Sequence, residues 1–276
     1  MQQFRQTYYP TILQAIHLLI LYLFIQTVID FPLALIDYYK GTDYLFNPVK
    51  KIILNTGSTL FIFIYGIRRS KAPLGEIFPF KFFNPLVIIP LVTFFWGAHN
   101  LLEKVNMHIE KILPAPPWFW ELFSKIFDSD FGWWGAFFKV VVMAPIIEEL
   151  IFRGIILNGL RKNYPAVTAV FMSALLFSLF HLNPWQIPAT FVLGLLLGWI
   201  LIRTRSILLA IIGHAINNLM VLLTVTYHQQ ISTHSIYLME DKEKFLLSGM
   251  IVLLSIILIY LATLWPSRKI IRKRAK

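Results

Sequence analysis

Eight apolar segments of at least 16 residues each occupy most of this 276-residue chain and restrict what it can fold into. Hydrophobic residues make up 57% of the sequence and charged residues only 14%, a composition typical of membrane proteins. A membrane span satisfies its backbone hydrogen bonds internally, which favours an α-helix in each segment. The predicted fold is an all-α polytopic membrane bundle of about eight transmembrane helices. The segments are 10–36, 52–67, 85–102, 133–157, 166–181, 187–202, 207–227 and 245–265.

The basic residues lie at the ends of these segments and give the chain a net charge of +11. They are not interleaved with aromatic residues on one soluble face, so the charge does not indicate a nucleic-acid partner. Their distribution obeys the positive-inside rule if both termini are cytoplasmic, and it favours membrane lipids as partners. The basic residues on that side are Arg68, Arg69, Lys71, Lys81, Arg161, Lys162, Arg203, Arg205 and the cluster from Arg268 to Lys276.

No polar stretch is long enough to form a second domain, so the sequence predicts a single membrane domain over residues 1–276. The chain contains no cysteine, which excludes thiol catalysis, disulfides and thiolate metal sites. The residues that carry chemistry are polar groups inside the apolar segments, and they fall within residues 133–227.

The sequence Glu148-Glu149-Leu150-Ile151-Phe152-Arg153 places charges inside the fourth apolar segment. Burying such groups in hydrocarbon costs a few kcal/mol each, so they mark either a functional site or an ion pair. Glu149 and Arg153 are four residues apart on one helix face in the favourable acid-before-base order. Glu148 has Phe152 at that spacing and no local partner. We therefore interpret Glu149 and Arg153 as a structural pair and Glu148 as a reactive carboxylate.

Two further polar clusters follow in later segments. Phe177 and His181 share one helix face, where the aromatic ring can cover and orient the imidazole. His214 and Asn218 project together from another helix. In a helix bundle these groups can converge with Glu148, because buried polar groups must satisfy one another.

The three motifs E-E-x-x-x-R, F-x-x-x-H and H-x-x-x-N, in this order, resemble the signature of the CPBP family, which comprises CAAX prenyl endopeptidases of the Rce1 type and their bacterial relatives. The resemblance covers Glu148 to Asn218 and says little about the first 130 residues. It implies a bacterial-type intramembrane endopeptidase in the plasma membrane, with a peptide or protein substrate that is lipidated in some relatives. It also implies that Glu148 is the catalytic base, assisted by His181, His214 and Asn218, with Glu149, Arg153 and Phe177 in support.

Peptide hydrolysis needs an activated water, a stabiliser for the oxyanion and an acid for the leaving amine. Glu148 can supply the first and third, and the two histidines can hold the water. A zinc ion held by His181, His214 and Glu148 is an alternative. The pattern H-E-x-x-H is absent, and Asn218 stands where a second helical histidine would lie. An amide is a poor zinc ligand but a good hydrogen-bond donor, so metal-free activation is slightly preferred and zinc stays open.

Two competing functions are a proton-coupled transporter that uses Glu148 and the histidines as a relay, and a non-catalytic membrane adaptor or immunity protein. A serine protease using Ser173 or Ser178 is disfavoured because no activated-serine motif surrounds them. The predicted boundaries raise one difficulty for all of these. At about 1.5 Å per residue, His181 lies roughly 10 Å further from the cytoplasmic side than Glu148 and His214. We expect the boundary of the fourth or the fifth segment to shift.

Overall fold

The computed structural model describes residues 7–42, 44, 48–118, 132–227 and 241–264. The described part of the chain contains helices and no strands, which confirms the all-α prediction. The longer helices are α1 (Ile12–Lys40), α2 (Pro48–Ser70), α4 (Ile88–Ile112), α9 (Ala166–Phe180), α10 (Ile187–Thr204), α11 (Ile207–Thr226) and α13 (Asp241–Thr263). The shorter ones are α3 (Leu74–Ile77), α6 (Gly132–Ala136), α7 (Ala144–Glu149) and α8 (Asn158–Asn163).

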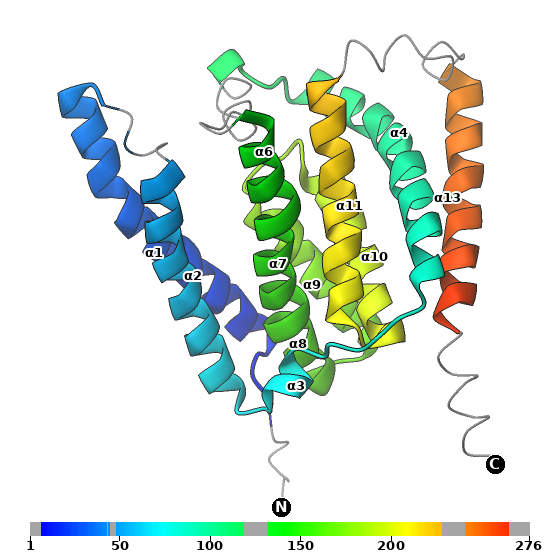
Figure 1. The fold of residues 1–276 in the computed structure, drawn as a ribbon, viewed down its shortest axis with the longest axis horizontal. Coiled ribbons are helices and arrows are strands. Elements are labelled where there is room, and N and C mark those ends of the chain that lie inside the picture. The colour runs from blue at the N-terminus through cyan, green and yellow to red at the C-terminus, as the bar shows by residue number, and fades with distance from the viewer. Residues whose placement is uncertain (1–6, 43, 45–47, 119–131, 228–240, 265–276) are drawn as a thin grey trace, which may run out of the picture.

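The helices run up and down in turn and form one bundle (Figure 1). The pair α1 and α2 stands at one edge, α4 and α13 pack together at the other, and the segments from α6 to α11 fill the centre. Helix α1 begins and helix α13 ends at the same end of the bundle. Five helices are long and apolar enough to cross a membrane, and α9 is a shorter apolar helix. These features fit an integral multi-pass membrane protein.

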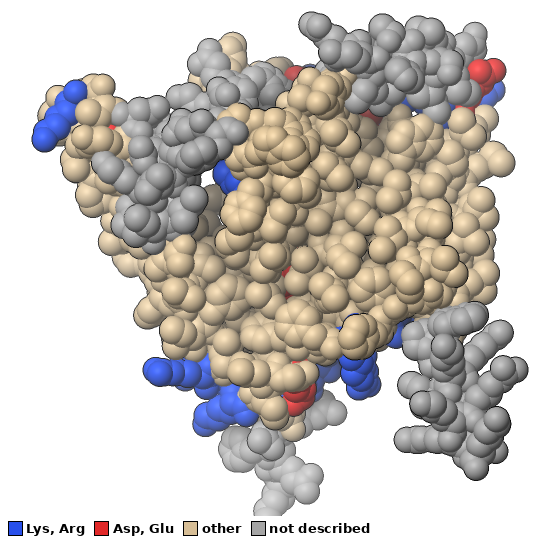
Figure 2. Space-filling model, in the orientation of Figure 1, with Lys and Arg blue, Asp and Glu red and all other residues tan. Residues whose placement is uncertain are grey.

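The outer surface is apolar over most of its height, and charged side chains gather towards the two ends (Figure 2). Large apolar side chains are exposed along α1, such as Leu13 at 75% and Phe24 at 63%. Exposed apolar side chains of this kind cover a lipid-facing surface. Lys and Arg are prominent at the lower end in Figure 2, where α3 and α8 lie.

Several predicted segments were shorter than the helices that contain them. The fourth segment is helical from Gly132 to Asn163, beyond the predicted end at residue 157. The third continues to Ile112 rather than ending at residue 102. In both cases the helix extends past the apolar run into polar sequence, because backbone hydrogen bonding continues until a specific signal ends it. The first segment likewise continues through Pro32 to Lys40, and Gly41 ends it in the left-handed conformation.

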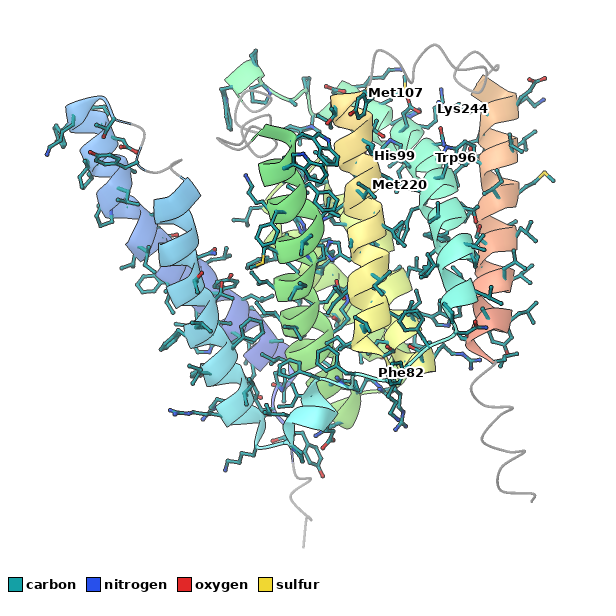
Figure 3. The ribbon with its side chains drawn as sticks, in the orientation of Figure 1. Phe82, Trp96, His99, Met107, Met220 and Lys244 are labelled. Carbon is teal, nitrogen blue, oxygen red and sulfur yellow. The ribbon has the colours of Figure 1, made fainter. Side chains whose placement is uncertain are left out.

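A loop between α3 and α4 crosses the lower end of the bundle. The carbonyl of Pro79 accepts a hydrogen bond from the Ile207 N–H at 2.9 Å, and the carbonyl of Lys81 accepts one from the Ser206 hydroxyl. These bonds tie the loop to the start of α11. Phe82 projects from the loop and is 96% exposed (Figure 3). An aromatic side chain in this position suits a membrane interface.

The close packing of α9 and α10 depends on Gly194. A Cβ atom at this position would lie 2.9 Å from the Cα of Ala174 on α9. The carbonyl of Gly194 also accepts a hydrogen bond from the Arg153 guanidinium at 3.3 Å. Small residues let membrane helices approach in this way. The glycine therefore brings α10 close enough to both α9 and Arg153.

Replacement of Gly194 by alanine is expected to lower the free energy of unfolding by about 1–3 kcal/mol, because the new methyl group meets backbone that cannot move aside. Thermal unfolding in detergent micelles measures the effect. Gly57→Ala is the matched control, since nothing lies within 4 Å of a Cβ at that helical position. Equal melting temperatures for the two variants would contradict the packing role of Gly194.

Candidate active site

The two glutamates lie on a short α-helical segment between two π-helical segments. Helix α7 begins at Ala144, has Pro145 in its first turn and ends at Glu149. The π-helical segments η2 (Phe137–Met143) and η3 (Leu150–Leu157) precede and follow it. Such π-helical insertions alter the direction in which neighbouring side chains project and are frequent at functional sites. The hydrophobic pattern does not indicate them.

Glu149 is completely buried and connects an arginine with a histidine. Its Oε1 atom accepts a hydrogen bond from Arg153 Nη1 at 2.8 Å, which confirms the predicted geometry of this pair. The same oxygen lies 2.8 Å from Nδ1 of His214 on α11. A carboxylate on one imidazole nitrogen fixes the orientation of the ring and leaves the other nitrogen for chemistry. The sequence did not predict that Glu149 would hold His214.

Glu148 faces the other nitrogen of the same histidine. Its buried Oε2 atom lies 3.9 Å from His214 Nε2 and has no hydrogen-bond partner among the described residues. The Glu148 side chain keeps 24% of its exposure, whereas that of Glu149 has none. The separation is too long for a direct hydrogen bond and short enough for one water molecule to contact both groups. Glu148 is therefore the more exposed carboxylate of the pair.

Phe177 on α9 lies at the centre of the site. Its fully buried ring packs edge-on against His181 at 4.9 Å between centroids and against His214 at 5.6 Å. The guanidinium of Arg153 lies over the same ring at 4.5 Å. The Phe177 carbonyl lies 2.9 Å from Nδ1 of His181, so a backbone hydrogen bond holds that imidazole as well. The predicted contact between Phe177 and His181 is thus present, and the same ring also links His181 to His214.

Asn218 lies one turn beyond His214 on α11. One of its amide N–H groups donates to the carbonyl of Val140 at 2.9 Å, and its Oδ1 accepts from Asn217 at 3.1 Å. Val140 belongs to the π-helical segment η2, so the amide satisfies a backbone acceptor there. The sequence had assigned Asn218 to the reaction alone. The structure shows that Asn218 also ties α11 to the helix that carries the glutamates.

Tyr22 and Thr59 approach the site from α1 and α2, and the sequence reasoning missed both. Their hydroxyls are 2.8 Å apart and both residues are buried. Tyr22 stacks on Phe180, next to His181, and is near enough to Glu148 for the two groups to interact electrostatically. A signal was present, because tyrosine usually lies at the ends of a span and Tyr22 falls well inside one.

The structure also resolves the difference in depth between Glu148 and His181. The fourth helix continues to Asn163, and α9 begins three residues later at Ala166. Glu148 is fifteen residues before the first of these positions and His181 is fifteen residues after the second. Both therefore lie at similar height above this turn, as the contacts from Glu148 to His214 and from Phe177 to both histidines also indicate. The predicted end of the fourth span at residue 157 caused the discrepancy.

The part of the chain that holds this site is similar to a known protein family. Residues 130–220 match the family model described as type II CAAX prenyl endopeptidase, Rce1-like. This segment is Rce1-like. The match confirms the resemblance seen in the three motifs and supports a CAAX-type intramembrane protease. No curated protein and no solved structure matches the chain.

The Rce1-like segment contains Glu148, His181, His214 and Asn218, together with the three supporting residues. Tyr22 and Thr59 lie outside it. In the described ranges, no group of three or more His, Asp or Glu side chains is arranged to hold one. Nδ1 of His214 is already occupied by Glu149. The chemistry below is therefore derived from the side chains alone.

Proposed function

We propose that the protein is an intramembrane endopeptidase in which Glu148 activates a water molecule for attack on a peptide bond. The observation that carries this proposal is the position of Glu148 opposite His214, whose other nitrogen is held by Glu149 and Arg153. This arrangement fixes one imidazole beside a carboxylate that has an unpaired oxygen. It gives a water molecule two polar partners in an otherwise apolar interior.

The reaction begins with a water molecule between Glu148 and His214. Glu148 takes one proton as the water oxygen attacks the carbonyl carbon of the substrate. The second N–H of Asn218 donates to the carbonyl oxygen and stabilises the negative charge that develops on it. Glu148 then returns its proton to the amine as the C–N bond breaks. The products are a new C-terminal carboxylate and a new amine.

The remaining residues position these groups. Phe177 contacts both imidazoles and the Arg153 guanidinium, so its ring keeps their relative positions. Arg153 neutralises Glu149 and is itself anchored to α10 through the carbonyl of Gly194. Catalysis by prepositioned groups of this kind avoids the energy cost of reorganising them during the reaction.

We further propose that residues 1–276 form a single membrane domain with both termini on the cytoplasmic face. The location of both described ends on one side of the bundle and the abundance of Lys and Arg there support this orientation. The substrate is a peptide or protein segment that reaches the site from the membrane or the cytoplasm. The lipid-facing surface around the bundle suits a lipidated substrate.

Proteomic comparison of membranes that carry the wild type or Glu148→Gln tests this function. Equal expression of the two proteins is verified first. We expect peptides with new C-termini only in membranes that contain the wild type, because glutamine cannot accept the proton of water. Their sequences define the substrate class, and lipid modification on them identifies CAAX-type processing. Identical peptide profiles with two folded proteins would favour a transporter or an adaptor instead.

A further inference from the structure

A cavity of about 790 Å³ lies at the basic end of the molecule, away from the site described above. Four parts of the chain line it: the segment before α1, the end of α2, α3 and α8. Its charged and aromatic lining residues are Tyr8, Tyr9, Arg69, Lys71, Glu76 and Lys162. The volume is within the range of small-molecule binding sites. Neither the family match nor the proposed reaction assigns a role to it.

Positive charge dominates the cavity. It contains three cationic side chains and one carboxylate, and Lys162 is paired with that carboxylate of Glu76 at 2.7 Å. Arg69 and Lys71 have no carboxylate partner in the described part of the chain. The guanidinium of Arg69 lies over the ring of Tyr9 at 5.7 Å, which orients it without neutralising its charge. The cavity therefore offers two unpaired cations to a ligand.

The walls of the cavity are held in place by specific contacts. The side chain of Asn163 on α8 accepts a hydrogen bond from the Tyr8 N–H at 2.9 Å and donates to the carbonyls of Tyr8 and Pro10. A Cβ atom at Gly159 would collide with Pro10, so only glycine allows α8 to approach the N-terminal segment this closely. Lys71 adopts a φ of 51°, which is uncommon for a residue other than glycine. The cavity is thus preorganised.

Tyr9 forms part of the cavity wall next to Arg69. Its hydroxyl is buried and has no hydrogen-bond partner. Burial and, to a smaller extent, the neighbouring Tyr65 raise the pKa of Tyr9 to about 12, so the hydroxyl keeps its proton near neutral pH. The neutral hydroxyl therefore does not offset the charge of Arg69, and the cavity keeps its positive character.

We propose that this cavity binds a phosphate-bearing anion, either the headgroup of an anionic phospholipid or free phosphate. The guanidinium of Arg69 and the ammonium group of Lys71 together match the oxygens of a phosphate group. The cavity adjoins lipid-facing surface: Leu13, next to the lining residue Gln14, is 75% exposed, and Leu74 on α3 is 59% exposed. Acyl chains can lie along these side chains while the headgroup occupies the cavity. Basic pockets between helices at the membrane surface bind anionic headgroups in this manner.

Native mass spectrometry of the full chain tests the proposal. The protein is placed in mixed micelles of phosphatidylcholine with or without phosphatidylglycerol, and the retained lipid is counted. The test variant is Arg69→Gln with Lys71→Gln. The matched control is Arg68→Gln with Lys81→Gln, which removes the same charge from exposed side chains outside the cavity. We expect the wild type and the control to retain phosphatidylglycerol with at least tenfold preference over phosphatidylcholine, and the test variant to lose that preference.

A second arm distinguishes the two sources of phosphate. The melting temperature of the protein in phosphatidylcholine micelles is measured with added inorganic phosphate or with phosphatidylglycerol. Stabilisation of the wild type by phosphatidylglycerol alone would assign the cavity to a lipid headgroup. Stabilisation by both would assign it to phosphate from either source. The test variant should respond to neither ligand.

Equal loss of lipid preference in the control and the test variant would overturn the proposal, because it would show a general effect of surface charge. Unchanged preference in the test variant would also overturn it. Both variants should melt at the wild-type temperature in phosphatidylcholine alone. If the loss of Arg69 from the Tyr9 ring lowers that temperature, Lys71→Gln alone provides the comparison, and it should weaken retention of phosphatidylglycerol several-fold.

Discussion

Glu148→Gln is expected to lower kcat for peptide cleavage by a factor of about 10²–10⁴, which is the usual contribution of a general base. The amide has the same shape as the carboxylate but cannot take a proton from water. The fold should be unaffected, because the nearest charged partner of Glu148 is His214 at 3.9 Å and its Oε2 makes no hydrogen bond. Turnover of a peptide identified by proteomics, measured with purified protein, gives kcat. Thermal unfolding of the same samples verifies the fold.

Glu149→Gln is the matched control, since it makes the same chemical change at the adjacent residue. Its consequences differ because Glu149 is fully buried and contacts both Arg153 and His214. We expect this variant to lose stability as well as activity, because Arg153 becomes an unpaired buried charge. Full turnover by Glu148→Gln would show that another group is the base. A large loss of stability in that variant would show that Glu148 has a structural role instead.

The fold could be predicted from the sequence to the extent that hydrophobicity determines it. In the described part of the chain each predicted apolar run is helical, because a chain in lipid has few other ways to satisfy its backbone. The ends of the helices were less predictable. Hydrophobicity changes at residue 157, whereas the helix ends at Asn163, where Tyr164 turns to an extended conformation and Pro165 precedes the next helix. Local backbone signals set that end, and they do not follow the apolar pattern.

The site was partly predictable for the same reason. Spacing along a helix identified Glu149 with Arg153 and Phe177 with His181, since contacts between residues four apart depend only on helix geometry. Contacts between helices could not be read in this way. The bonds from Glu149 to His214 and from Asn218 to Val140 join residues 65 and 78 positions apart. Val140 lies in one π-helical segment and Glu149 directly precedes the other, and the apolar pattern indicates neither segment.

Arg153→Met is expected to lower the free energy of unfolding by about 3–5 kcal/mol. The Arg153 side chain is almost completely buried. It donates hydrogen bonds to Glu149 and to the carbonyl of Gly194, and its guanidinium lies over the ring of Phe177. Methionine fills similar space but leaves the Glu149 carboxylate without its cation in an apolar interior. Equilibrium unfolding in mixed detergent and lipid micelles measures the loss. Arg203→Met is the surface control, because that arginine is exposed and its guanidinium lies over the Tyr260 ring at 4.7 Å, and it should cost about 1 kcal/mol or less.

The double variant Glu149→Gln with Arg153→Met separates the charge effect from the loss of packing. It contains no unpaired buried charge, so it should be more stable than Arg153→Met alone, and the two substitutions should be strongly non-additive. It should still cleave poorly, because His214 has lost the carboxylate that orients its ring. A double variant no more stable than the single one would mean that packing around Arg153 dominates its effect. Recovery of stability without activity would instead show that Arg153 allows a buried Glu149 to exist and that Glu149 in turn positions His214 for the reaction.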